Sequence, residues 1–327
     1  NRLAPFHWHA HEMIFGYALA VIAGFLLTAA QNWTGVETLH GKGLAGLFFI
    51  WCIARLLNLK GSALLPHAAI ADIAFIFTLT AAIALPVLAA RQWRQLPVLL
   101  ILCLLAVAST DYYLAALSGN TELQVDSLYA GLYLVLALIL FMGRRVIPFF
   151  TERGVGYEVK LKNYRWNDIL TWLLFPAFLI AEIAFHGSQA GALLAGVLCL
   201  SNAIRLYGWY TPGIWSKPLL WSLHTGFFLI ILALALRALE PVIVISPMIT
   251  LHAFAVGGVG LVTLCMMPRV SLGHTGRSVH RAPPSVSLFL LLMVAAAFVR
   301  VLGPWLDLDH YENWITVAGV LWIAAFT

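Results

Sequence analysis

Long apolar runs constrain the fold of this chain more than any other feature of its sequence. Eleven of them approach the about 20 mostly apolar residues that a helix needs to cross a bilayer. They cover about residues 12–30, 43–58, 68–88, 96–117, 126–147, 169–186, 190–209, 219–238, 242–267, 286–303 and 312–327. The runs are too long for strands and lack the alternating pattern of an outer-membrane barrel. We therefore predict an all-α fold, a polytopic transmembrane helix bundle with eleven spans.

Composition agrees with a membrane protein and excludes other classes. Apolar residues make up 62% of the chain and charged residues only 10%, whereas a soluble domain has about 25% charged residues. The longest hydrophilic stretch, about 151–168, is short enough for a loop. We expect one transmembrane domain over residues 1–327, with a start that looks like an internal cut and a C-terminus cut within an apolar run. A soluble enzyme, a disordered chain and a disulfide-stapled domain are excluded.

Basic residues fall mainly on one side of the predicted membrane. If the loops alternate between the two sides, 14 of the 19 lysines and arginines share a side, and the positive-inside rule makes that side cytoplasmic. The Asn1 end of the chain is then periplasmic. The periplasmic loops and helix ends hold the other five, which are Arg2, Arg55, Lys60, Arg237 and Arg300. Because the net charge of +5 is spread over many short loops, we expect no nucleic-acid partner.

Three histidines cluster at the start of the chain, at His7, His9 and His11. Neutral imidazole is the commonest metal ligand among side chains, so the cluster is a candidate metal site. On a helix His7 and His11 share a face, whereas His9 joins them only in an extended segment. Glu12 is a candidate hydrogen-bond acceptor that orients a ligating ring. The alternative is an interfacial belt, since aromatic residues alternate with the histidines.

Two further histidines lie inside apolar runs. His252 belongs to the ninth run and His224 to the eighth. An ionisable group inside a membrane is costly, which makes each a functional candidate, although a neutral ring bonded to a neighbouring helix explains it equally well. His252 belongs to the same leaflet as the trio, so we expect it to partner His9 or His11. His224 is expected near His274 on the cytoplasmic side, giving two separate polar centres.

Charged side chains complete the candidate set. Arg269 and Arg277 are candidates to clamp an anion or a haem propionate, or else they anchor the cytoplasmic face. Acids within or near the spans are candidates for a proton relay, or they pair with Arg55 or Arg300. These acids are Asp72, Asp111 and Glu182.

Several strings of residues resemble one known family. They are His7–Met13 (HWHAHEM), 24–29 (GFLLTA), 32–35 (NWTG), 144–151 (RRVIPFFT), 223–226 (LHTG) and 266–277 (MMPRVSLGHTGR). In this order, over most of the chain, they resemble the NnrS family.

The resemblance implies a bacterial inner-membrane protein with twelve spans that binds haem and copper and belongs to the nitric oxide response. One leading helix plus the eleven runs gives that number, with the complete N-terminus in the cytoplasm. His9 and His11 become first-choice ligands with His252 as partner, and His224 and His274 are weaker candidates. The chain has no C-x-x-C-H string, so any haem is non-covalent.

Three functions compete on this basis. The first is a haem- and copper-binding protein that binds or detoxifies nitric oxide, in contact with membrane lipid. The second is a transporter or channel for a small solute, a metal or haem, with histidines and acids along an aqueous path. The third is an assembly or interaction protein with a partner in the respiratory chain. Enzymatic turnover is left open, since the chain has no hydrolase or nucleotide-binding motif.

Overall fold

The computed structural model describes residues 4–327, which fold into helices joined by short loops, with no strand in that range. The predicted all-α class is therefore confirmed. Asn1 and Arg2 lie outside the described residues, and so does the expected periplasmic position of the Asn1 end. The chain forms two compact units, one ending at Leu138 and the other running from Ile139 to Thr327. The expectation of one domain stays a prediction.

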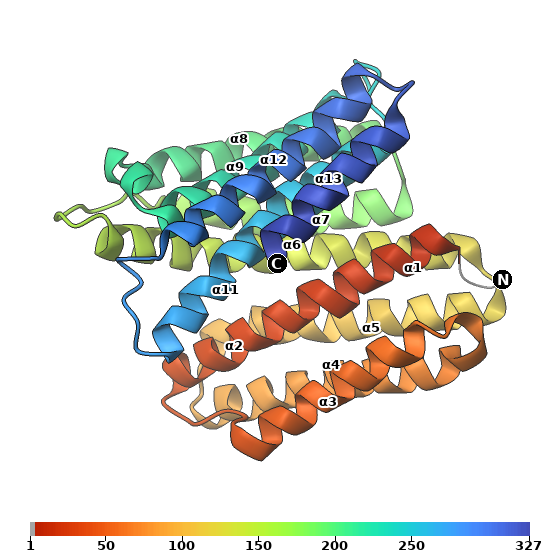
Figure 1. The fold of residues 1–327 in the computed structure, drawn as a ribbon, viewed down its shortest axis with the longest axis horizontal. Coiled ribbons are helices and arrows are strands. Elements are labelled where there is room, and N and C mark those ends of the chain that lie inside the picture. Colours follow the sequence, from red (N-terminus) through yellow and green to blue (C-terminus); the bar gives the residue numbers. More distant parts are fainter. Residues whose placement is uncertain (1–3) are drawn as a thin grey trace. The chain divides into compact units, whose positions relative to one another are not determined.

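The first unit begins with three helical segments in direct succession. Its described elements are α1 (Pro5–His11), the π-helix η1 (Glu12–Ala18), α2 (Leu19–Thr34), α3 (Gly41–Asn58), η2 (Gly61–Leu64), α4 (Leu65–Ala89), η3 (Trp93–Gln95), α5 (Leu96–Ser118) and the first half of α6 (Thr121–Gly154). Helix α3 packs against α4, and α4 packs against both α2 and α5 (Figure 1).

The second unit contains the rest of α6 and a second π-helix. Its elements are α7 (Arg165–Ala184), α8 (Gln189–Trp209), η4 (Pro212–Ser216), α9 (Pro218–Leu239), α10 (Pro247–His252), the π-helix η5 (Ala253–Gly260), α11 (Leu261–His274), α12 (Pro284–Leu306) and α13 (Tyr311–Phe326). Helix α9 packs against α8, η5 and α11, and α12 packs along α13 (Figure 1).

Ten helical stretches within residues 4–327 are long and apolar enough to cross a membrane. They coincide with the first ten apolar runs of the sequence, so the chain is a multi-pass membrane protein. The eleventh run forms α13, whose 16 residues span about 24 Å, less than the about 30 Å of a hydrocarbon core.

The first span begins earlier than its apolar run. The run starts at about residue 12, but the continuous helical stretch is Pro5–Thr34. Proline at the first helical position has a preset φ and needs no hydrogen-bond partner for its nitrogen, so Pro5 starts the helix ahead of the apolar residues. The stretch ends where Gly35 adopts a left-handed φ of 67°, which glycine does without steric cost. The histidine trio therefore lies in this helix rather than before it.

Candidate functional site

The first turns of α1 direct two of the three early histidines into the first unit. His7 and His11 are buried at 5% and 1% exposure, whereas His9 is exposed. This separation confirms the helical arrangement, in which residues four apart share a face. His7 is held by a side-chain hydrogen bond with Gln124, and its carbonyl accepts a 3.3 Å bond from the Tyr112 hydroxyl.

Neighbouring groups fix the ring of His11. It stacks on the ring of Tyr112, with centroids 4.4 Å apart and planes inclined by 25°. Its Nδ1 lies 3.2 Å from Glu12 Oε1. An ionised carboxylate only accepts hydrogen bonds, so Nδ1 carries the proton. The other nitrogen, Nε2, is buried without a hydrogen-bond partner and lies 3.7 Å from Asp72 Oδ2.

One arginine connects the two carboxylates beside His11. Arg55, on α3, donates from Nη1 to Glu12 Oε1 at 2.6 Å and from Nη2 to Asp72 Oδ1. The pairing of Asp72 with Arg55, one of the two alternatives that the sequence left open, is thus present. Asp72 is 1% exposed, and a carboxylate at that depth needs hydrogen bonds on both oxygens. Tyr113 and Asn58 supply them by donating to Oδ2.

Gly16, in the π-helix, makes room for this arginine. A Cβ atom at Gly16 would lie 2.5 Å from Arg55 Nη1 and 3.3 Å from Glu12 Oε2. The Gly16 carbonyl also accepts a 2.9 Å bond from Trp51 Nε1 of α3. Single π-helical turns recur at functional sites because they rotate the register of the following side chains. Here the turn starts at Glu12, directly after the buried imidazole.

The charges of this cluster favour a cation. With His11 neutral, the carboxylates of Glu12 and Asp72 outweigh the one guanidinium of Arg55, which leaves a net charge of −1 in a region of low polarity. A proton or a metal ion on His11 Nε2 would neutralise it. No three histidine, cysteine, aspartate or glutamate side chains of residues 4–327 converge as metal ligands. The cluster thus offers one imidazole nitrogen with a carboxylate beside it.

His252 occupies the end of α10 in the second unit. Its Nδ1 lies 2.7 Å from the Met248 carbonyl, and its Nε2 lies 3.0 Å from Arg300 Nη2. A metal at Nε2 would therefore displace Arg300. The expected partnership of His252 with His9 or His11 joins residues of the two units and stays a prediction.

The candidates that are expected from the sequence on the cytoplasmic side make mostly backbone contacts. His224 has both ring nitrogens on carbonyl oxygens, Nδ1 at 3.0 Å from Leu220 and Nε2 at 3.2 Å from Trp209. That geometry leaves no lone pair facing a ligand. Arg269 donates to the Leu219 carbonyl at 3.0 Å, and its guanidinium lies 4.0 Å from the Phe150 ring centroid. Two further candidates, His274 and Arg277, are exposed.

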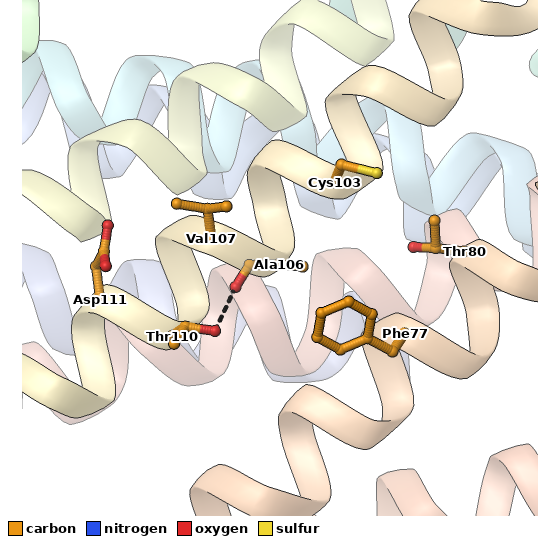
Figure 2. A pocket seen from close by; sticks show the side chains of 7 residues that line it. All are labelled: Phe77, Thr80, Cys103, Ala106, Val107, Thr110 and Asp111. Carbon is orange, nitrogen blue, oxygen red and sulfur yellow. Dashed lines mark hydrogen bonds between the residues drawn. The ribbon is translucent and has the colours of Figure 1, made fainter.

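The remaining acids lie apart from the His11 contacts. Glu182 forms a buried ion pair with Arg237, 2.7 Å from Nη2, rather than with either arginine proposed from the sequence. Asp111 is half-buried on a groove of about 280 Å³ formed by α4 and α5 (Figure 2). The other residues that line this groove are Phe77, Thr80, Cys103, Ala106, Val107 and Thr110.

Sequence reasoning missed three residues of the cluster. Tyr112 and Tyr113 follow Asp111 in an apolar run, and Asn58 ends α3. Two adjacent tyrosines within a span were a usable signal, because a buried phenol hydroxyl needs a hydrogen-bond partner inside the protein.

These observations define a class: a multi-pass helical membrane protein in which a buried imidazole and a buried carboxylate lie beside a partly buried carboxylate and arginine within one unit. A comparison with known protein families identifies the family within this class. The family model described as NnrS protein matches residues 1–327, and the chain belongs to the NnrS family. That membership suggests a membrane protein of the nitric oxide response. No curated protein matches the chain.

Proposed function

We propose that this protein is a haem- and copper-binding protein of the bacterial inner membrane that binds or detoxifies nitric oxide. One observation carries the proposal beyond the family: the buried Nε2 of His11 has no hydrogen-bond partner. An imidazole with one nitrogen bonded to a carboxylate and the other free is the usual arrangement of a histidine ligand. Imidazole suits both iron and copper.

The residues around His11 have separate tasks in this proposal. Glu12 keeps the proton on Nδ1, so the lone pair stays on Nε2, and Tyr112 holds the plane of the ring. A haem held there would supply an iron that binds nitric oxide. Burial and the unpartnered nitrogen support His11 ahead of the exposed His9. The other candidates for copper are His7, His9 and His252.

The carboxylates keep the cluster attractive to a cation. Arg55 neutralises one of the two negative charges, and the hydroxyl of Tyr113 and the amide of Asn58 stabilise Asp72 without adding charge. Asp72 Oδ2 lies 3.7 Å from His11 Nε2, so a cation on that nitrogen would be close to a carboxylate. A metal ion there would offset the remaining negative charge of the cluster.

A transporter is the second candidate, because a charged network buried in spans also marks ion and substrate pathways. Asp72, Arg55 and Glu12 form such a network. In that case the protein moves a small solute, a metal or haem, and His11 carries protons rather than a cofactor. An interaction with a respiratory-chain protein is compatible with either function.

Purification distinguishes the two candidates. The proposal predicts haem absorption that shifts when nitric oxide is added, and copper in metal analysis. His11→Gln keeps a donor toward Glu12 but lacks the imidazole lone pair, so it is expected to lose the haem absorption. His280→Ala changes an exposed loop histidine and serves as the control. Colourless wild-type protein that moves solute into liposomes would instead support the transporter.

A further inference from the structure

The helical segment that carries His11 has a counterpart in the second unit. Both begin with a proline at the start of a short helix, α1 or α10, and in both a histidine is the last residue before a π-helix. The π-helices are η1 and η5. A glycine follows each histidine by five residues, Gly16 after His11 and Gly257 after His252.

We call each of these two helical segments, together with the arginine that contacts it, a copy. In each copy the arginine comes from the long helix that follows the segment. Arg55 of α3 bonds to Glu12, the residue after His11. Arg300 of α12 bonds to His252 itself, and α12 packs against both α10 and η5. Each unit therefore contains a histidine, a π-helix and an arginine in the same order, and the arginine bonds to the histidine itself or to the residue that follows it.

The two copies differ in charge. In the first unit Glu12 and Asp72 surround Arg55, which gives a net charge of −1. In the second unit Ala253 stands in the place of Glu12. Within the described part of the chain, no carboxylate forms an ion pair with Arg300, which is 8% exposed. Counted over His252, Ala253 and Arg300 alone, this copy has a net charge of +1; the carboxylate of Glu240, which accepts from Thr250 of α10, pairs with Arg237 instead.

His252 does not neutralise this charge. Its Nδ1 faces the Met248 carbonyl and so carries the proton, while Nε2 accepts from Arg300 Nη2. The ring is neutral in this arrangement. Arg300 Nη1 is buried and has no hydrogen-bond partner, and the Tyr311 ring centroid lies 5.9 Å from the guanidinium carbon. The Tyr311 side chain is a further hydrogen-bond partner of the guanidinium, but a phenol does not neutralise the positive charge, and Nη1 is left without an acceptor.

Two other buried arginines of the second unit have the carboxylate partner that Arg300 lacks. Arg205 and Arg237 are also less than a tenth exposed. Arg205 pairs with Asp168 at 2.9 Å, and Arg237 pairs with Glu182 at 2.7 Å. Arg269 forms no ion pair with a described carboxylate either, but it is only half-buried and donates to the Leu219 carbonyl. A buried cation without an anionic partner is destabilising, so the arrangement at Arg300 favours a negative group from outside the chain.

We propose that Arg300, with His252 holding one of its nitrogens, is a binding site for a monoanionic carboxylate or small oxoanion. One negative charge brings the copy to neutrality, whereas a doubly charged phosphate would leave an excess inside a span. Planar groups with two oxygens match the flat guanidinium fork. The site does not depend on haem at His11, and the anion is either free in solution or the carboxylate of a bound lipid or cofactor.

Two measurements on the purified full chain test the site and identify the source of the anion. Thermal unfolding is followed while sodium nitrite or sodium formate is added, with sodium chloride, which has neither a carboxylate nor an oxoanion, at equal ionic strength as the reference. Non-covalent carboxylates that accompany the protein are then identified by mass spectrometry. Each measurement compares wild type with Arg300→Gln and with Lys60→Gln, an exposed residue of the first unit.

A free anion is expected to raise the unfolding temperature of wild type and Lys60→Gln, with an apparent Kd that rises roughly tenfold or more in Arg300→Gln. A resident carboxylate is expected instead to accompany wild type and be lost in Arg300→Gln. Arg300→Lys retains the charge without the fork and gives an intermediate result if the Gln variant does not fold. If neither free nor resident anion depends on residue 300, the proposal is wrong, whatever becomes of haem binding.

Discussion

The ring of His11 lies on the ring of Tyr112, with centroids 4.4 Å apart. This stacking and the bond from Nδ1 to Glu12 set the direction of Nε2, which lies 3.7 Å from Asp72. A ring held at its face and at one nitrogen presents the other nitrogen in one fixed direction. Such preorganisation lowers the cost of ligand binding, because less side-chain freedom is lost.

Replacing Gly16 by alanine tests the contact between the π-helix and Arg55. The new methyl group would lie 2.5 Å from Arg55 Nη1, so we expect Gly16→Ala to lower the free energy of unfolding by about 1–3 kcal/mol. Gly24→Ala is the matched control, since nothing lies within 4 Å of a Cβ there. It should be neutral or stabilise by up to about 1 kcal/mol. Thermal unfolding in detergent measures both, and equal effects would contradict the contact.

Breaking the ion pair of Arg55 and Asp72 should be more damaging than removing both partners. Arg55→Met leaves the buried Asp72 and the partly buried Glu12 without a cation, at a cost of about 3–5 kcal/mol. Adding Asp72→Asn removes one of those charges, so the double variant should lose less than the sum of the single variants. A double-mutant cycle of unfolding free energies gives the coupling. Additive effects would show that the two side chains do not interact in the folded protein.

Glu240 links stability to pH at the end of α9. Burial raises the pKa of this carboxyl, while the Thr250 hydroxyl and Arg237 lower it and Glu182 raises it. A raised pKa means that the folded state favours the protonated acid. The stabilising effect is therefore complete below the unfolded pKa of about 4.3 and is lost as pH rises through the higher folded pKa.

Glu240→Gln mimics the protonated acid and tests this linkage. The variant should be more stable than wild type at neutral pH, and the difference should shrink as the pH falls toward 4. Unfolding temperatures measured across that range provide the comparison. Glu312→Gln, at an exposed position of α13, is the control. A difference in unfolding temperature that grows on acidification would show that the folded protein favours the ionised form of Glu240 instead.

Apolar run length predicted most of the fold, because the bilayer fixes how long a spanning helix must be. It placed the start of the first span too late, since Pro5 and the histidines begin that helix without being apolar. The shared face of His7 and His11 followed from their spacing. Helical periodicity left the pairing of Asp72 with Arg55 open and missed Tyr113, because these contacts join side chains of three different helices.

The sequence also did not show that Arg55 and Arg300 have different kinds of partner. Both arginines lie near the C-terminal end of a span, and the sequence proposed each as a partner for an acid. Packing gives Arg55 two carboxylates and Arg300 an imidazole. Which groups meet inside a bundle depends on helix rotation, and a π-helix changes that rotation within one turn.

The optical spectrum of purified His11→Gly, with and without added imidazole, tests most directly whether His11 is the haem ligand. We expect the variant to lose haem absorption, free imidazole to restore it by occupying the vacated position, and His280→Gly to behave like wild type in both conditions. Full haem absorption in His11→Gly without imidazole would contradict the assignment of His11 as the ligand.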